Sequence, residues 1–295
     1  MIELLEKENE IEKNEFKDLI NTKNENIGDT LLQKLNLEND YNDFLVLILK
    51  VKYSQDYASL NMFGLNAIDY ITSSVNMCET KIVEYNLEDD IIKVIKRNLN
   101  NKKYVAVVFS DTPLIRRHTF LEILDYFKYK SLCALKFNRG YVFDAEYLLS
   151  VEKVYNPQVQ NFNEEDFIKV VDEKSFAMCL ETLKKRILAY HMDRGVIIKD
   201  LNSVFIDAEV NIDKGVIIEN NVNLQGKTVI KNSCLIGSNV KIKNAIIEEN
   251  CVIENASIEN SIIKQNAKIT DFSVIKNVTI EENEIKICEK IIRRD

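Results

Sequence analysis

The stretch VFIDAEVNIDKGVIIENNVNLQGKTVI, residues 204–230, decides the fold of the C-terminal part of this chain. Isoleucine or leucine returns in it at every sixth position, and the repeat runs on to Ile280 with some steps shortened to five. A helix repeats every 3.6 residues and a half-buried strand every two, so neither produces this pattern. A period of six predicts a parallel β-helix built from hexapeptide repeats. The repeated aliphatic residues are Ile206, Ile212, Ile218, Leu224, Ile230, Ile236, Ile242, Ile247, Ile253, Ile258, Ile263, Ile269, Ile275 and Ile280.

Each hexapeptide is expected to form one short strand and one corner, with its aliphatic side chain stacked on the equivalent side chains of neighbouring coils. The corners need residues that tolerate left-handed backbone angles, and asparagine is frequent at those positions here. With about three hexapeptides per coil, the repeat predicts about four to five coils. The asparagines that we assign to corners are Asn220, Asn232, Asn244, Asn255, Asn260 and Asn277.

Upstream of the repeat, near-continuous apolar runs alternate with helical patterns. This alternation is typical of an α/β domain whose parallel strands are buried on both faces. Asp111 directly follows the third apolar run, which places it at the carboxyl edge of the sheet, where open α/β sheets bind ligands. The predicted strands span residues 44–49, 81–85 and 104–109, and the predicted helices span 65–75, 87–99, 116–129 and 173–195.

Composition restricts the class of protein. The formal net charge is −8 and the isoelectric point is about 5.1, which argues against a general partner in nucleic acid or in a membrane surface, because phosphates are held by clustered lysine and arginine. No apolar run approaches the length of a membrane helix. The start, MIELLEKENE, has no apolar signal region, and the six cysteines show no metal-binding spacing, so we expect a cytoplasmic protein with reduced thiols.

Three segments together resemble one family. They are SDTPLI (110–115), FNRGYVFDAEYL (137–148) and MDRGVIIKDLNSVFIDAEVNID (192–213), the last of which opens the repeat. The combination is similar to the bacterial bifunctional UDP-N-acetylglucosamine pyrophosphorylase and glucosamine-1-phosphate N-acetyltransferase. The resemblance implies a reduced Rossmann-like nucleotidyltransferase domain followed by a short left-handed parallel β-helix. The implied boundaries are 1–43 for a charged N-terminal extension, 44–172 for the nucleotidyltransferase-like domain, 173–195 for a linking helix, 196–283 for the β-helix and 284–295 for a tail.

The same resemblance implies a magnesium site. In the family the acid of a GD-x-PL motif holds the catalytic Mg²⁺, and Asp111 matches that acid. Asp172 matches the family's second ligand, an asparagine just before the linking helix, and Mg²⁺ prefers such oxygen ligands and bridges substrate phosphates. The residues alone leave alternatives open, because Asp111 begins a good turn sequence and Asp172 is a good helix cap.

The resemblance also implies a nucleotide or nucleotide sugar as ligand. Asn138 matches the asparagine that contacts the sugar, and Gly140 matches the glycine that follows in the same motif. Between them Arg139 replaces the usual threonine or serine.

Other parts of the family pattern are missing. The glycine-rich phosphate loop that follows the first strand has no counterpart, since no glycine occurs between that strand and Gly64. Lys50 and Lys52 could act as point charges there, but a lysine does not recreate a cradle of main-chain amides. The uracil-binding segment is absent too. The family's acetyl-transfer residues lie in later coils, and the two histidines, His118 and His191, precede the repeat, so no acetyltransferase site can be assigned.

Two hypotheses follow from the sequence. In the first, the chain is a degenerate, catalytically impaired relative of the pyrophosphorylase with a binding or assembly role. In the second, it is an active, reduced Mg²⁺-dependent UDP-N-acetylglucosamine pyrophosphorylase that uses Asp111 and Asp172. We favour the first because lost phosphate donors typically cost about 10² to 10³ in rate each. Outward aliphatic residues of the repeat, Val229, Leu235 and Ile262, further predict a homotrimer formed through the β-helix.

Overall fold

The computed structural model describes residues 41–53 and 55–293. They form two compact units, and the division falls inside a long helix after Cys179. A short segment, Asn61–Leu65, belongs with the second unit although the first surrounds it in sequence. The predicted extension 1–43 lies almost wholly outside the described residues.

The first unit is built on a six-stranded sheet in the order β2-β1-β3-β5-β4-β6. The first three strands run parallel to one another, as the sequence predicts. The fifth strand is antiparallel to both of its neighbours, which the sequence did not indicate. The strands are β1 (Phe44–Lys52), β2 (Glu79–Asn86), β3 (Tyr104–Phe109), β4 (Ala134–Phe137), β5 (Gly140–Asp144) and β6 (Gln158–Val159).

Three α-helices of this unit, α3, α4 and α6, begin at side chains that cap them. At one helix the side-chain amide of Asn66 and the carboxylate of Asp69 form a reciprocal capping box. At two others, Asp90 and Asp144 accept main-chain N–H groups. The elements are η1 (Tyr57–Ser59), α3 (Ala67–Ser74), α4 (Ile91–Asn98), α5 (Arg117–Tyr129), α6 (Ala145–Ser150) and η2 (Glu164–Phe167), and α7 (Glu173–Asp193) leads into the second unit.

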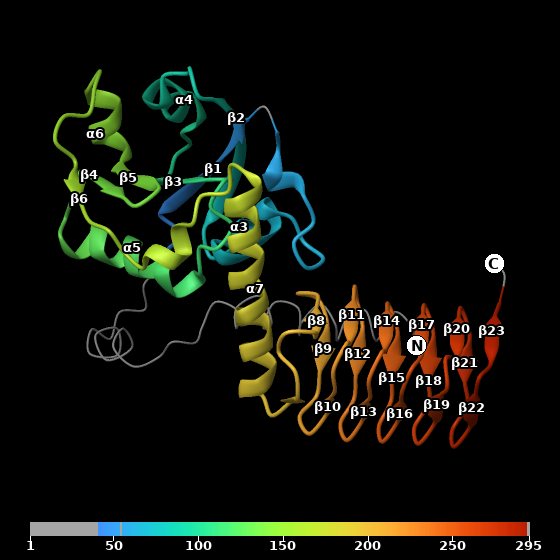
Figure 1. Cartoon of the computed structure of the whole chain (residues 1–295). Coiled ribbons are helices and arrows are strands. Elements are labelled where there is room, and N and C mark those ends of the chain that lie inside the picture. Colours follow the sequence, from blue (N-terminus) through green and yellow to red (C-terminus); the bar gives the residue numbers. More distant parts are fainter. Residues whose placement is uncertain (1–40, 54, 294–295) are drawn as a thin grey trace. The chain divides into compact units, whose positions relative to one another are not determined.

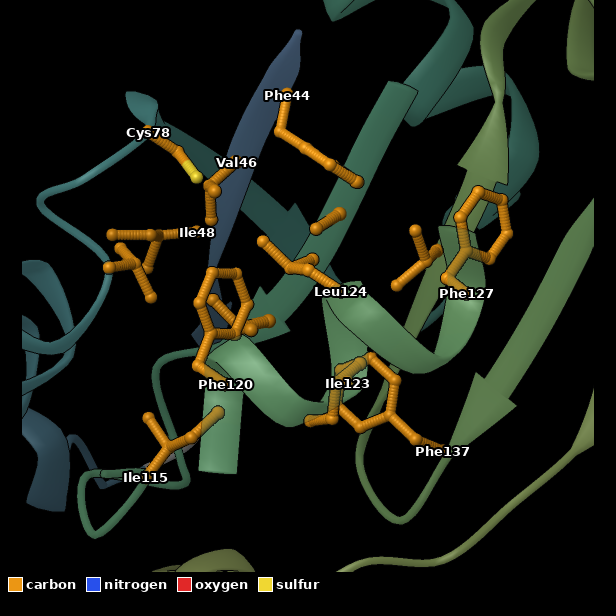
Figure 2. Close-up of a cluster of buried hydrophobic side chains, with 14 of the residues drawn as sticks. Phe44, Val46, Ile48, Cys78, Ile115, Phe120, Ile123, Leu124, Phe127 and Phe137 are labelled. Carbon is orange, nitrogen blue, oxygen red and sulfur yellow. The ribbon is translucent and has the colours of Figure 1, made fainter. Parts of the chain in front are cut away.

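Strand β1 is buried on both faces, which explains its unbroken apolar sequence. Alternate residues point to two different cores. Figure 2 shows one of them, where Phe120, Ile123 and Leu124 of α5 face Val46 and Ile48 of β1. The other core lies on the opposite face and includes Leu45, Leu47, Leu49, Phe109 and Ile95.

The prediction that β2 is buried was wrong. The strand lies at the edge of the sheet, and Ile82 in its centre is 52 % exposed. Glu79, Lys81 and Glu84 flank its apolar residues, and charged side chains of this kind commonly keep edge strands from pairing with other chains.

The second unit is the left-handed parallel β-helix that the period of six predicts. Its strands stack in register into three sheets, so that Ile218 pairs with Ile236 and Ile236 with Ile253 (Figure 1). The stack continues past residue 283. One sheet contains β7 (Ile197–Ile198), β10 (Ile217–Ile218), β13 (Leu235–Ile236), β16 (Val252–Ile253), β19 (Lys268–Thr270) and β22 (Ile285–Ile287). A second contains β8 (Phe205–Ile206), β11 (Asn223–Gln225), β14 (Lys241–Lys243), β17 (Ser257–Glu259), β20 (Val274–Lys276) and β23 (Lys290–Ile292). The third contains β9 (Asn211–Ile212), β12 (Val229–Ile230), β15 (Ile246–Ile247), β18 (Ile262–Ile263) and β21 (Thr279–Ile280).

Most of the predicted corners are confirmed, because Asn244, Asn255, Asn260 and Asn277 all have positive φ. Two assignments were one residue early. The left-handed residues are Asn221 and Ser233 rather than the asparagine before each of them. Both positions of each pair are polar, so composition alone does not choose between them.

Among residues 41–53 and 55–293, no helix has the length and apolar character needed to cross a membrane.

Candidate functional site

The candidate site lies at the carboxyl edge of the sheet, where β1 and β3 end beside the turn that joins β4 to β5. Ser110 fixes the end of β3. Its N–H donates to the carbonyl of Leu49 at 2.9 Å, and its Oγ accepts the N–H of Val51 at 3.1 Å. Asp111 is therefore held directly beside the C-terminal end of β1.

The carboxylate of Asp111 is buried, and both of its oxygens accept hydrogen bonds. The residue is 1 % exposed. Arg139 donates from Nε to Oδ1 at 3.2 Å and from Nη2 to Oδ2 at 2.8 Å, and the hydroxyl of Tyr53 donates to Oδ2 at 2.6 Å. A guanidinium that donates two parallel hydrogen bonds to a carboxylate forms a charge-assisted pair, which is stronger and more specific than a neutral hydrogen bond.

Arg139 is positioned by more than this ion pair. It occupies the two-residue turn between β4 and β5, in which Phe137 pairs with Gly140. Its guanidinium carbon lies 4.0 Å from the centre of the Phe109 ring, a cation–π contact with the last residue of β3. The side chain is 28 % exposed, so one side of the guanidinium reaches the surface.

Tyr53 is part of the same cluster. Burial, and then its hydrogen bond to Asp111, raise the pKa of the Tyr53 hydroxyl well above its usual value. The hydroxyl therefore stays protonated and donates to the carboxylate throughout the physiological range. Lys169 lies over the ring of Tyr53 at 5.4 Å from its centre.

Asp172, the second predicted metal ligand, caps α7. Its Oδ1 accepts the hydroxyl of Ser175 at 2.6 Å and the main-chain N–H of Ser175 at 2.7 Å. These hydrogen bonds hold the pKa of the Asp172 carboxyl below its usual value. The geometry is that of a helix N-terminus whose unpaired N–H groups are satisfied by a side chain.

Asn138 and Gly140 serve the packing of the same turn. The side chain of Asn138 accepts the N–H of Phe162 at 2.7 Å and donates to the carbonyl of Phe162 at 3.3 Å, so both ends of its amide are used by main chain. A Cβ at Gly140 would lie 2.1 Å from the ring of Phe137 and 2.4 Å from the carbonyl oxygen of Val107. Close strand packing alone therefore requires glycine at position 140. Sugar contact by either residue stays a prediction.

The main chain where a phosphate loop would begin belongs to the sheet. Lys50, Val51 and Lys52 still pair with β2, and Val51 donates its N–H to Ser110. Lys50 and Lys52 both point a side-chain nitrogen toward Glu84, at 3.6 Å and 3.7 Å. Over these residues the amides that could cradle a phosphate are already committed to strand pairing.

A second buried ion pair lies at the start of α5. Arg116 contacts Asp166 through Nε at 2.8 Å, and the hydroxyl of Thr119 donates to the same carboxylate at 2.5 Å. All three residues are buried. This network ties α5 to η2, so Arg116 serves packing in this arrangement.

The two predicted acids do not form a metal site of the expected kind. Both oxygens of Asp111 face a guanidinium, and Asp172 uses one oxygen as a helix cap. Within the part of the chain that the structure describes, no group of three or more His, Cys, Asp or Glu residues is arranged to hold a metal ion. The residues present therefore do not fit Mg²⁺ at Asp111, because a divalent ion would have to take the place of Arg139.

Sequence reasoning identified Asp111 but missed both of its partners. Arg139 carried a signal, since it is the one departure within the asparagine–glycine motif of the turn. Tyr53 carried none, because its role depends on β1 running straight on where the resemblance leads one to expect a loop.

Comparison with known proteins supports a partial relationship. No protein-family model matches the chain. The bifunctional protein GlmU of Alkaliphilus metalliredigens is 33 % identical over 110 residues, which is 37 % of this chain and 24 % of that protein. The GlmU of Clostridium tetani is 44 % identical over 70 residues, which is 24 % of this chain and 15 % of that protein. The GlmU of Thermodesulfovibrio yellowstonii is 35 % identical over 103 residues, 35 % of this chain and 23 % of that protein.

One solved structure, Rv0371c from Mycobacterium tuberculosis H37Rv, matches 48 % of this chain and 98 % of its own, with 10 % identity and a TM-score of 0.33. A likeness of that size bears on neither fold nor function. The matched stretches span between 15 % and 24 % of the three GlmU proteins' own lengths. Over 24 % to 37 % of its length, this chain is similar to part of the bifunctional GlmU proteins.

Proposed function

We propose that the chain is a non-catalytic relative of the sugar-1-phosphate nucleotidyltransferases, which binds a nucleotide or nucleotide sugar without turnover and assembles through its β-helix. The observation that carries this proposal is the side-on ion pair of Arg139 with Asp111. Both oxygens of Asp111, the acid that by resemblance would hold the catalytic metal ion, are hydrogen-bonded to Arg139 and so are not available for metal-assisted phosphoryl chemistry.

The path of β1 supports the same proposal. Nucleotidyl transfer needs oriented donors for the charge that develops on the phosphates. Here the main chain up to Lys52 pairs with β2, and the residue after it, Tyr53, turns its hydroxyl onto Asp111. The ion pair at Asp111 and the strand pairing of β1 therefore both argue against catalysis at the carboxyl edge of the sheet.

Two sheets of the β-helix carry outward apolar columns in their middle coils and one sheet is polar there, which supports a homotrimer. Ile217, Leu235 and Val252 form an outward, part-exposed column on one sheet. Ile246 and Ile262 form another on the third sheet. The second sheet presents Asn223, Lys241 and Ser257 at the equivalent positions of its middle coils, between Phe205 and Val274.

A closed threefold assembly uses two different faces of each protomer and leaves the third to solvent. The outward columns match that requirement. One sequence-based assignment needs correction. Val229 is in register with Ile246 in the outward column, but it is only 8 % exposed, so little of its side chain is available to a neighbouring protomer.

The test is a pair of measurements on the purified chain. Calorimetric titration with UTP and with UDP-N-acetylglucosamine, with and without Mg²⁺, measures binding, and a pyrophosphate assay with UTP and N-acetylglucosamine 1-phosphate measures turnover. We expect binding without release of pyrophosphate. Turnover that disappears in Asp111→Ala would overturn the proposal in favour of an active, reduced pyrophosphorylase, and absence of binding to both ligands would remove its ligand-binding part.

A further inference from the structure

In the cluster formed by Asp111, Arg139 and Tyr53, the carboxylate of Asp111 binds a cation that the chain itself supplies, the guanidinium of Arg139. A carboxylate offers about four acceptor positions on its two oxygens. Three of them are taken at Asp111, two by Arg139 and one by Tyr53. The acid is 1 % exposed, so no bulk water compensates its charge.

The guanidinium occupies the place that a metal ion would need. Mg²⁺ sits about 2.0 to 2.1 Å from its oxygen ligands in a near-ideal octahedron and retains several waters. A side-on arginine with donors on both oxygens covers the front of the carboxylate, where such an ion would bind. The main-chain carbonyl of Asp111 is also used, since it accepts the N–H of Val170 at 2.7 Å.

The arginine is held at this position independently of the acid. The β4–β5 turn presents it, the packing of Gly140 against Val107 fixes that turn, and the ring of Phe109 lies under the guanidinium. A side chain that is fixed before it meets its partner loses little conformational entropy on forming the pair. The position of the charge is therefore part of the fold.

We propose that Arg139 is a built-in replacement for a divalent cation at Asp111, so that this edge of the sheet is a metal-independent site. An anionic ligand at this edge would therefore bind to the fixed guanidinium of Arg139 and not to a metal ion. That last consequence rests on the ligand binding proposed above, but the exclusion of the cation does not.

The experiment measures binding of Mn²⁺ alone to the full chain, by the electron paramagnetic resonance signal of the free ion, with no nucleotide present. Five proteins are compared: wild type, Arg139→Ser, Arg139→Lys, Asp111→Asn and the double variant Arg139→Ser with Asp111→Asn. Serine removes the charge and leaves a small hydroxyl, whereas lysine retains a positive charge at the same place.

We expect wild type and Arg139→Lys to show no Mn²⁺ site that depends on Asp111. Arg139→Ser should gain one site per chain with at least tenfold tighter binding than wild type, and the double variant should lose it. A Mn²⁺ site in wild type that Asp111→Asn abolishes would overturn the inference, as would a folded Arg139→Ser that gains no binding. If Arg139→Ser does not fold, the comparison of wild type with Asp111→Asn still decides the question.

The result is separable from the proposed function. Pyrophosphate release by a wild-type protein that binds no Mn²⁺ at Asp111 would refute the non-catalytic role and leave the inference standing. A Mn²⁺ site at Asp111 in a protein without turnover would refute the inference and leave the non-catalytic role standing.

Discussion

The Nη2 atom of Arg139 lies 2.8 Å from Oδ2 of Asp111, within a pair whose acid is 1 % exposed and whose base is 28 % exposed. This difference in burial matters, because a guanidinium released from the pair can be solvated and the carboxylate cannot. The two halves of the ion pair should therefore respond differently to substitution.

Loss of Arg139 should cost more stability than loss of the charge on Asp111. Arg139→Ala leaves a buried carboxylate with only Tyr53, and we expect it to lower the free energy of unfolding by about 2 to 3 kcal/mol. Asp111→Asn retains the shape and leaves a partly exposed guanidinium, so about 1 to 2 kcal/mol is expected. Urea unfolding of both single variants and the double variant measures the difference. Equal costs for the two single variants, or strict additivity in the double variant, would contradict this account.

Gly140→Ala should be among the most damaging small substitutions in the sheet. The added methyl group would lie 2.4 Å from the carbonyl oxygen of Val107, which is strand main chain and cannot move aside cheaply. We expect a loss of at least about 2 kcal/mol, as for overpacked core positions. Gly215→Ala is the control, because its φ of +78° is left-handed but no atom lies within 4 Å of the new methyl group. Its cost should stay near about 1 kcal/mol. Similar unfolding midpoints for the two variants would show that the contact at Gly140 is not limiting.

The outward column of the β-helix should control assembly. Leu235→Glu places a charge in the apolar column while leaving its inward neighbour Ile236 in the core. We expect light scattering to report about three times the chain mass of 34.2 kDa for wild type and close to the chain mass for Leu235→Glu. Lys241→Glu changes a charge on the polar face and should leave the trimer intact. A wild-type monomer at all concentrations would refute the trimer.

The stability of the second unit should fall as the pH is lowered, in part through His191. Burial lowers the pKa of this imidazole to about 3, whereas an unfolded histidine has a pKa of about 6.5. The folded pKa lies below the unfolded one, so this contribution is complete above about pH 6.5 and is lost as the pH falls toward 3. The slope is at most about 1.4 kcal/mol for each pH unit.

His191→Phe should remove that part of the pH dependence. Between about pH 7 and pH 5 the unfolding free energy of wild type should fall by up to about 2 kcal/mol more than that of the variant. His118→Gln, at the only other histidine, provides the control and should behave as wild type. An unchanged pH dependence in His191→Phe would mean that the buried imidazole is not responsible.

The β-helix could be predicted from sequence because its core consists of one structural position that is repeated along the chain. Each inward residue, from Ile206 to Ile280, occupies an equivalent environment, so fourteen positions report on the same geometry. The strands β1 and β3 were also predictable, since both faces of each are buried. The edge position of β2 and the reversed direction of β5 were not, because strand order depends on contacts between distant segments.

The candidate site was predictable only in part, for a related reason. The motif around Asp111 located the acid, and the turn motif located Asn138, Arg139 and Gly140. Neither motif indicates that Arg139 of the turn would contact Asp111, which lies 28 positions away in sequence. That contact arises from the antiparallel pairing of β3 with β5, which brings Gly140 opposite Val108.

The most direct test of the central claim is a crystal structure of the chain grown with excess Mn²⁺ and UTP, with diffraction data collected at the manganese absorption edge. We expect Arg139 to remain side-on to Asp111 and no anomalous peak within coordination distance of either carboxylate oxygen. An anomalous peak bound to Asp111, with the guanidinium of Arg139 displaced, would contradict the account.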